Sequence, residues 1–398
     1  MDKRIYLDNA ATTSVNPGVL DDMIPYYTEY YGNPSSVYGF AQKTKAAVED
    51  SRRIIAEFIG ADANEIYFTA GGTESDNWAV KSAAYSLREK GKHIITTKIE
   101  HHAVLHTCEF LEKNGFDVTY LDVDENGLVN PDELKKAIRD DTILISVMYA
   151  NNEIGTIQPI KEIGKIAKEH GIVFHTDAVQ AFGHIRLNVD ELNIDMLSAS
   201  GHKIYGPKGI GIMYLRKNLR IEPLIHGGAQ ERNKRAGTHN VPGIVGMASA
   251  VKLADSRLEK NASHESALRD YLIARVMEEI PYTRLNGDKE KRLPNNANFS
   301  FMFIEGESLL MMLDSAGICC SSGSACTSGS LDPSHVLLAI GLPHEIAHGS
   351  LRVTLSDETK KEHMDYLVDK LKEIVERLRS MSPLYDDFIK SGKGGKNV

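Results

Sequence analysis

Short apolar runs recur between residues 66 and 215, and stretches with helical periodicity separate them. Most of these runs are continuously apolar rather than alternating, which is typical of strands covered on both faces. Strands that alternate with helices predict an α/β fold with a mostly parallel, doubly wound sheet. The expected strands begin at Ile66, His93, Val118, Ile143, Val173, Asp195 and Gly211.

The pattern changes after about residue 255. Long charged helical stretches follow at 257–279 and 358–381, with only brief strand-like runs at 298–303 and 351–355. This texture predicts a second, smaller α+β domain towards the C-terminus. We therefore expect a large domain of residues 16–255 and a small domain formed by residues 1–15 together with 256–390. Residues 391–398 are expected to form a flexible tail.

Charge and hydropathy exclude several classes of partner. The chain has 46 Lys and Arg against 55 Asp and Glu, a net charge of −9, and such a field repels nucleic acid and anionic lipid. The first ten residues lack the apolar region of a signal peptide, and no stretch approaches the roughly 18 apolar residues of a membrane span. We expect a cytoplasmic protein that binds neither nucleic acid nor a membrane.

Polar side chains and glycines cluster where the expected strands end. In doubly wound sheets, ligands bind outside the carboxyl ends of the strands, so these residues predict a cofactor site. Gly71 and Gly72 precede a helix, and the N–H groups of a helix N-terminus bind phosphate. The residues at the strand ends are Gly71, Gly72, Thr73, His101, Asn152, Asp177, Gln180, Ser200, His202 and Lys203.

Lys203 and Asp177 indicate which cofactor this is. Neither a Gly-x-Gly-x-x-Gly motif after the first strands nor a P-loop motif occurs, which disfavours nicotinamide and nucleoside triphosphate. Lys203 lies in a tight, partly apolar turn, where desolvation would free its amine as a nucleophile. A lysine for the aldehyde, a carboxylate for the pyridine nitrogen and a phosphate cradle together predict pyridoxal 5′-phosphate.

The four cysteines form no disulfide framework for a chain of this length. Cys326 lies in a run of small residues, 319–330, which predicts a mobile loop that carries a nucleophilic thiol. Cys108, Cys319 and Cys320 belong to apolar surroundings and are predicted to be small core residues. A metal or iron–sulfur site built from the clustered thiols stays open as an alternative, although a matching second pair is missing.

One motif points to a different class of enzyme. His344, Glu345 and His348 form a literal His-Glu-x-x-His, the signature of zinc peptidases. The helix that carries it can run only from Pro343 to Gly349, which is short for such a site. The zinc peptidase is therefore kept as a remote alternative.

The chain resembles the pyridoxal-phosphate-dependent cysteine desulfurases of the NifS/IscS type, within the class V aminotransferase group. The resemblance covers nearly the whole chain, and so many motifs in the same order are highly specific. They are YLDNAATT at Tyr6, YGNPSS at Tyr31, TAGGTESDN at Thr69, EHHAV at Glu100, NNEIGTIQP at Asn151, HTDAVQ at His175, SGHKIYGPKGIG at Ser200, RAGTHN at Arg235, SSGSACTSG at Ser321 and HGSLRVTLS at His348.

The resemblance implies the PLP fold type I and a role for each matching residue. Lys203 would form the Schiff base, Asp177 would hold the pyridine nitrogen, and Gln180 would donate to the ring hydroxyl. His101 would stack on the ring and relay protons, and Cys326 would accept the sulfur as a persulfide. The phosphate would be held by Gly72, Thr73, Ser200, His202 and Thr238 of the other subunit. The substrate carboxylate would be held by Asn152 and Arg352.

The implied reaction converts L-cysteine to L-alanine in a homodimer and passes the sulfur to an iron–sulfur scaffold or a thio-modification acceptor. No resident metal is implied, although Cys326 could ligate a cluster in transit. Alternatives within the fold are an aminotransferase and a selenocysteine or cysteine sulfinate lyase, which need no mobile thiol. A non-catalytic sulfur-binding scaffold would leave Lys203 and Asp177 unexplained. The tail from Ser382 is short, which leaves the acceptor protein open.

Overall fold

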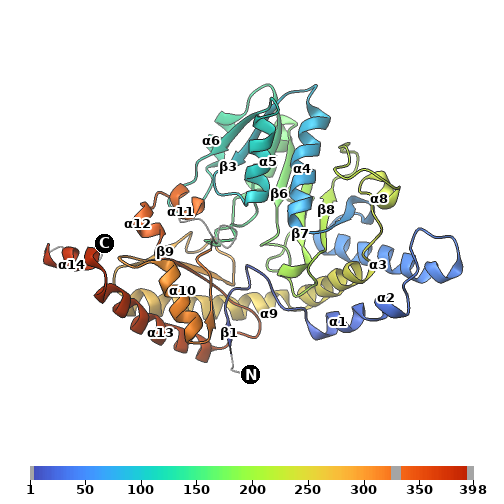
Figure 1. Ribbon diagram of the computed structural model, residues 1–398. Helices are drawn as coiled ribbons and strands as arrows, with labels where there is room; N and C mark the ends of the chain where they lie inside the picture. The colour runs from blue at the N-terminus through green and yellow to red at the C-terminus, as the bar shows by residue number, and fades with distance from the viewer. Residues whose placement is uncertain (1–3, 324–332, 392–398) are drawn as a thin grey trace.

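The computed structural model describes residues 4–323 and 333–391 (Figure 1). Its largest sheet has seven strands in the order β2-β8-β7-β6-β5-β3-β4. All neighbours are parallel except β8, which is antiparallel to both β2 and β7. The prediction of a mostly parallel sheet is confirmed, and each expected strand is present: β2 (Ile66–Thr69), β3 (His93–Thr97), β4 (Asp117–Leu121), β5 (Thr142–Ser146), β6 (Val173–Asp177), β7 (Met196–Ser200) and β8 (Gly211–Leu215).

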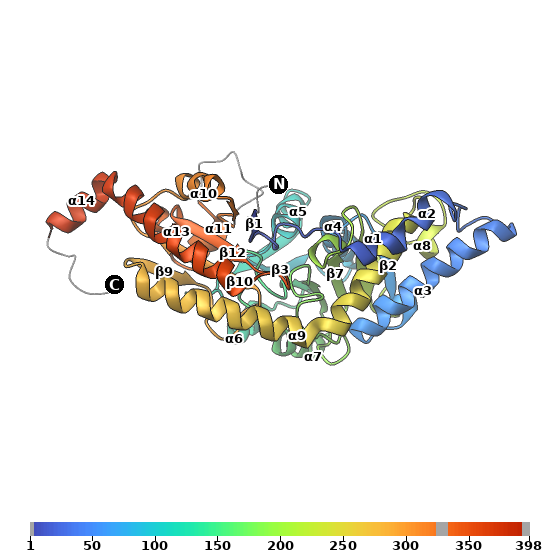
Figure 2. The same ribbon diagram turned by 90° about the horizontal axis from the view of Figure 1, so that it is seen from below.

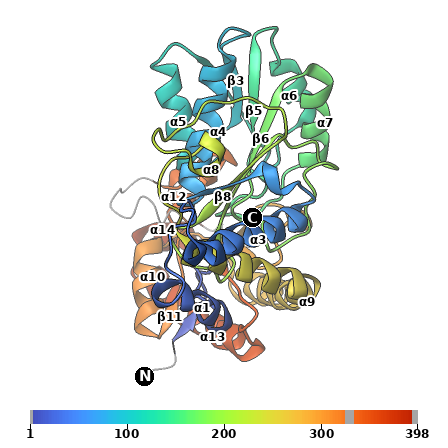
Figure 3. The ribbon, with the colours of Figure 1, turned by 90° about the vertical axis from the view of Figure 1, so that its right-hand side faces the viewer.

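Helices cover both faces of this sheet. Figure 3 shows α4 and α5 on one side and α6 and α7 on the other. Apolar side chains of α4 and α5 form one core with the strands, and those of α3 and α7 form a second core on the opposite face. The helices of this part are α1 (Pro17–Met23), α2 (Pro25–Thr28), α3 (Gln42–Ile59), α4 (Gly72–Leu87), α5 (His102–Glu112), α6 (Pro131–Ala137), α7 (Ile160–His170) and α8 (Gln230–Asn233), with short 3₁₀ turns η1 (Gly39–Ala41), η2 (Ala63–Glu65) and η3 (Gly201–Lys203).

The C-terminal part forms a separate core around a three-stranded antiparallel sheet, β12-β10-β9. The N-terminal strand β1 (Ile5–Tyr6) pairs in parallel with β11 (Ile318–Cys319), which attaches the start of the chain to this part. Cys319 was expected in a loop and lies instead in β11. The other elements are β9 (Thr283–Asn286), β10 (Asn296–Phe301), β12 (Ser350–Thr354), α10 (Gly306–Ser315), α11 (His335–Ala339), α12 (His344–Ala347), α13 (Lys361–Ser380) and α14 (Pro383–Lys390).

One long helix, α9 (Val241–Glu279), runs beneath both parts (Figure 2). The prediction placed its start at residue 257, but the helix begins 16 residues earlier, where the Asn240 side chain accepts a hydrogen bond from Gly243 N. Its first turns contribute to a core of the large sheet, and its last turns contribute to the C-terminal core. We propose that these cores mark two domains with the boundaries expected from the sequence, joined by α9.

The other cysteines are partly as predicted. Cys108 is completely buried in the α4–α5 core, which confirms its prediction as a core residue. Cys320 is half-buried and packs against the C-terminal core, and burial raises the pKa of its thiol. The rest of the expected loop from residue 324, and most of the expected tail, lie outside the described residues. None of the described helices combines the length and apolar composition needed to cross a membrane.

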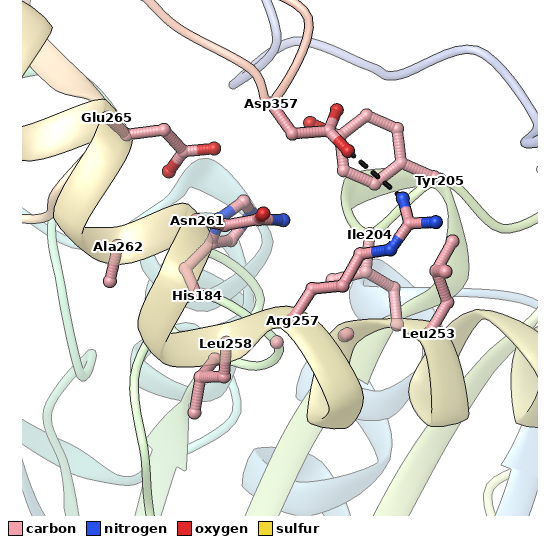
Figure 4. A pocket seen from close by; sticks show the side chains of 12 residues that line it. His184, Ile204, Tyr205, Leu253, Arg257, Leu258, Asn261, Ala262, Glu265 and Asp357 are labelled. Atoms are coloured by element: carbon pink, nitrogen blue, oxygen red, sulfur yellow. Dashed lines mark hydrogen bonds and ion pairs between the residues drawn. The ribbon is translucent and has the colours of Figure 1, made fainter.

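A small cavity of about 20 Å³ lies where α9 meets the end of β12 (Figure 4). Arg257 and Asp357, both on its wall, form an ion pair of 3.4 Å. Glu265 is only 2% exposed and also lines this cavity. Burial, and then the nearby charge of Asp357, raise the pKa of Glu265 to about 8. Glu265 is therefore largely protonated at neutral pH.

This burial predicts that Glu265 destabilises the fold as the pH rises. The unfolded chain loses the Glu265 proton near its ordinary pKa, whereas the folded chain keeps it until about pH 8, so stability falls between these values by up to ~1.4 kcal/mol per unit. We expect Glu265→Gln to gain about 2–3 kcal/mol over the parent between pH 6 and 8.5. Denaturant unfolding at several pH values measures this difference, and a pH-independent difference would contradict it.

Candidate active site

A cavity of about 320 Å³ lies at the carboxyl ends of the parallel strands. It collects most of the residues that the sequence predicted, from segments far apart in the chain. Thr238 does not line it, and Cys326 lies outside the described residues. The lining residues are Ala10, Ala11, Gly72, Thr73, Asp76, His101, Met148, Ala150, Asn152, Asp177, Val179, Gln180, Ser200, His202, Lys203, Gly323 and Arg352.

The N-terminus of α4 forms one wall of the cavity and leads into an adjoining hollow. Gly71 precedes the helix and has no side chain to cap its first N–H groups. Gly72 is required by close packing, because a Cβ there would lie 2.6 Å from Val179 Cγ2. Ser200, His202 and Lys208 also line this hollow. Uncapped N–H groups beside hydroxyl and cationic side chains suit a phosphate.

Lys203 ends the short turn η3 that follows β7. Its Nζ donates to the carbonyl oxygens of Ala10 and Ala11, at 2.5 and 2.9 Å. The same N-terminal segment accepts a hydrogen bond from Gln180 Nε2 through Ala10 O, at 3.0 Å. These contacts aim the lysine amine into the cavity, as the sequence predicted.

Asp177 is the last residue of β6 and is 6% exposed. One of its oxygens, Oδ1, accepts a hydrogen bond from Val179 N at 2.9 Å. Burial raises the pKa of Asp177 to about 6, while this hydrogen bond and the charge of Lys203 oppose the shift. The carboxyl group is therefore mainly ionised at neutral pH and can pair with a protonated ring nitrogen.

His101 caps the N-terminus of α5. Its Nδ1 accepts a hydrogen bond from Ala103 N at 3.1 Å, which assigns the proton of the neutral ring to Nε2. Burial, followed by the charge of Lys203, lowers the pKa of His101 to about 4. The ring is therefore neutral at physiological pH and carries its proton on Nε2.

Arg352 lies on β12 and connects three segments at the cavity. Its Nη1 donates to Asn152 O at 2.8 Å, and its Nη2 pairs with Asp8 Oδ1 at 2.7 Å. The side chain is 2% exposed, and its Nε has no hydrogen-bond partner among the described residues. A buried guanidinium with a donor left over suits a small carboxylate ligand.

Several residues of the site were not predicted from the sequence. Asp8 and the carbonyl groups of Ala10 and Ala11 lie within the YLDNAATT motif, yet their contacts with Arg352 and Lys203 join positions more than 190 residues apart. Asp76, in the TESDN motif, and Lys208 were also missed. Their place within the family motifs was the one sign in the sequence that they belong to the site, but a motif does not indicate where a side chain points.

The zinc peptidase alternative has no support in the geometry. Helix α12 has only four residues, and both His344 and His348 are exposed. Within residues 4–323 and 333–391, no group of three or more His, Cys, Asp or Glu side chains is arranged to hold a metal ion. The motif is part of the segment that leads to β12 and Arg352.

The similarity of this chain to known proteins shows its family and its type of enzyme. Residues 5–367 match the family of class-V aminotransferases, and the chain belongs to this family. It is 59% identical to cysteine desulfurase IscS of Methanosarcina thermophila over 382 residues, 96% of this chain and 94% of that one. It is 56% identical to cysteine desulfurase IscS of Clostridium botulinum over 393 residues, 98% and 99% of the two chains. Within the family, the chain is a cysteine desulfurase of the NifS/IscS type.

Solved structures agree with this assignment. A NifS-like protein is 41% identical, with a TM-score of 0.89, and the match covers 94% of this chain and 100% of that chain. SspA, solved in complex with cysteine, is also 41% identical, with a TM-score of 0.79 and coverage of 89% and 99%. The α/β fold predicted from the sequence is confirmed as PLP fold type I.

Proposed function

We propose that this enzyme uses pyridoxal 5′-phosphate to transfer the sulfur of L-cysteine to the thiol of Cys326. The carbon–sulfur bond of L-cysteine breaks, a sulfur–sulfur bond forms, and the products are L-alanine and a Cys326 persulfide. No external oxidant or reductant is needed, because the proton of the thiol balances the one gained by alanine. The observation that carries this proposal is that Lys203, Asp177 and the uncapped start of α4 face one cavity.

The residues of the cavity fit each part of the cofactor. Lys203 would bind the aldehyde, Asp177 the pyridine nitrogen, and Gln180 the ring hydroxyl. The phosphate would lie at the N-terminus of α4, held by Gly72, Thr73, Ser200 and His202. When bound, pyridoxal phosphate withdraws electrons from the α-carbon of the substrate. The buried negative charge of Asp177 supports this withdrawal by keeping the ring nitrogen protonated.

Arg352 and Asn152 would bind the carboxylate of L-cysteine. Both line the cavity, and the buried Arg352 Nε lacks a partner within the described segments. The ion pair with Asp8 holds the guanidinium in place, so little conformational entropy is lost when the substrate binds.

His101 would move protons at the substrate. Its capping contact with Ala103 N engages Nδ1 as an acceptor, so the neutral ring carries its proton on Nε2 and would donate it there. Stacking of this ring on the cofactor is part of the proposal.

Cys326 would receive the sulfur and carry it to an acceptor. Gly323 lines the cavity and stands three residues before Cys326 in the sequence, a length of chain that spans at most about 10 Å. We further propose a cytoplasmic homodimer in which the exposed Thr238 contributes to the phosphate site of the other subunit. The acceptors would be an iron–sulfur scaffold or a thio-modification protein.

The test of this function is a stoichiometric assay with the purified protein. We expect added L-cysteine to perturb the visible absorption of the bound cofactor and to yield equal amounts of alanine and reductant-releasable sulfide. Cysteine sulfinate and selenocysteine serve as comparison substrates, and pyruvate with an amino-group donor tests transamination. Transamination without sulfide, or a protein that binds no pyridoxal phosphate, would overturn the proposal.

A further inference from the structure

A second buried carboxyl group lies beside Asp177 and has no role in the reaction proposed above. Asp76, on the first turns of α4, is 1% exposed and lines the same cavity. The hydroxyl of Ser198 on β7 lowers the pKa of Asp76, and the Cα atoms of Ser198 and Asp177 are paired in the sheet. Asp76 is therefore part of the floor of the cofactor site.

The hydrogen bonds behind Asp76 run in one direction. Ser146 Oγ and His175 Nδ1 are 2.8 Å apart, and His175 Nε2 lies 3.0 Å from Ser198 Oγ. Burial lowers the pKa of His175 to about 3, so its ring is neutral and carries one proton. With that proton on Nε2, Ser146 donates to His175 and His175 donates to Ser198.

Asp76 Oδ1 is buried without a hydrogen-bond partner among the described residues and lies 3.7 Å from His175 Nε2. An ionised carboxylate with an unpaired buried oxygen is costly, whereas a protonated carboxyl group places its proton there. Two neighbouring carboxyl groups also avoid ionising together.

We propose that Asp76 is a positioning residue that stays a neutral carboxylic acid, so that the pair of carboxyl groups carries its single negative charge on Asp177, where the cofactor nitrogen binds. This inference rests on the proposed function and assigns a second group to its cofactor site. The roles of the two residues follow from their surroundings: Asp177 has a backbone N–H donor and the charge of Lys203 nearby, whereas Asp76 has a buried oxygen without a partner among the described residues.

The surrounding charged groups favour a neutral Asp76 beside an ionised Asp177. Burial raises the pKa of Asp76 most, and the negative charges of Asp177 and, more weakly, Glu100 raise it further. The hydroxyl of Ser198 opposes this shift. Glu100 is itself buried, and its pKa is raised to about 8. The other titratable groups around the floor are the neutral His175 and His101 and the cation Lys203.

The experiment measures the affinity of the apoprotein for pyridoxamine 5′-phosphate, which has the ring and the phosphate but cannot bond to Lys203. Asparagine imitates the neutral acid, so we expect Asp76→Asn to match the parent within about threefold at pH 6.5. The ratio of the two dissociation constants should grow only at the higher pH at which Asp76 ionises in the parent, because the new negative charge strengthens binding of the protonated ring.

Each outcome has a separate meaning. A ratio that already exceeds tenfold at pH 6.5 overturns the role of Asp76, because asparagine would then fail to replace a neutral acid. A parent protein that does not bind pyridoxamine 5′-phosphate overturns the proposed function instead. Glu265→Gln is the matched control, because it removes another buried carboxyl group of raised pKa far along the chain, and its ratio should not change with pH.

A second variant keeps the test valid if Asp76→Asn does not fold. Ser198→Ala removes the hydroxyl that favours the ionised form of Asp76, so the alkaline change in affinity should move to higher pH than in the parent. A Ser198→Ala protein whose affinity already falls more than tenfold at pH 6.5 would count against the inference, because the hydroxyl favours only the ionised form of Asp76. A purely structural role would lower affinity equally at every pH.

Discussion

Replacing Lys203 by alanine is expected to lower the rate of alanine formation from L-cysteine by on the order of 10⁴-fold or more. The amine of Lys203 is held in the cavity by Ala10 O and Ala11 O, and no other lysine lines that cavity within the described residues. The variant should also lose the visible absorption of the lysine-bound cofactor. Absorption spectra and alanine assays on the same sample measure both effects.

Two controls separate covalent attachment from charge. Lys203→Arg keeps the positive charge near Asp177 but cannot bond to an aldehyde, so it should be as inactive as Lys203→Ala. Lys208→Ala removes a cation from the hollow at the start of α4, and it should weaken cofactor affinity while keeping the visible absorption. A Lys203→Ala enzyme that retains more than a tenth of the parent rate would contradict the proposed role.

Replacing Cys326 by serine should reduce sulfur release by about 10³-fold or more while leaving the absorption of the bound cofactor intact. A thiolate accepts sulfur readily, whereas a serine hydroxyl is not ionised at neutral pH and is a poor nucleophile. The prediction rests on the sequence motif and on the connection to Gly323. Alkylation followed by mass spectrometry should detect a persulfide on Cys326 of the parent after incubation with L-cysteine.

The other cysteines are the matched controls. Burial raises the pKa of Cys320 and of Cys108, so both stay thiols and are poor nucleophiles at neutral pH. Cys320→Ser and Cys108→Ala should therefore retain sulfur release. Full sulfur release by Cys326→Ser would instead favour a lyase or aminotransferase mechanism that needs no thiol on the enzyme.

The limits of sequence-based prediction follow from particular elements. The strands of the large sheet were predictable because both of their faces are covered, which selects continuously apolar runs such as 143–146. The first turns of α9 were missed because small and apolar residues between 241 and 251 are buried on most sides, which removes the polar face of a typical surface helix. Only the later turns, with an exposed face, showed a helical pattern.

The site, like the fold, was predictable from the sequence only in part. By itself, the sequence determined which chemical groups follow each strand, among them Asp177, Lys203 and His101, because parallel strands place their carboxyl ends at one edge of the sheet. The residues carrying the desulfurase motifs therefore predicted most of the cavity.

Only the tertiary structure decided what surrounds those groups. The ion pair of Asp8 with Arg352 depends on the pairing of β1 with β11 and on the bridge between Ser321 and Arg352. The unpaired oxygen of Asp76 depends on how closely α4 packs against β6 and β7. Burial and partners determine whether a carboxyl group is ionised, and both arise from contacts between segments that are distant in the sequence.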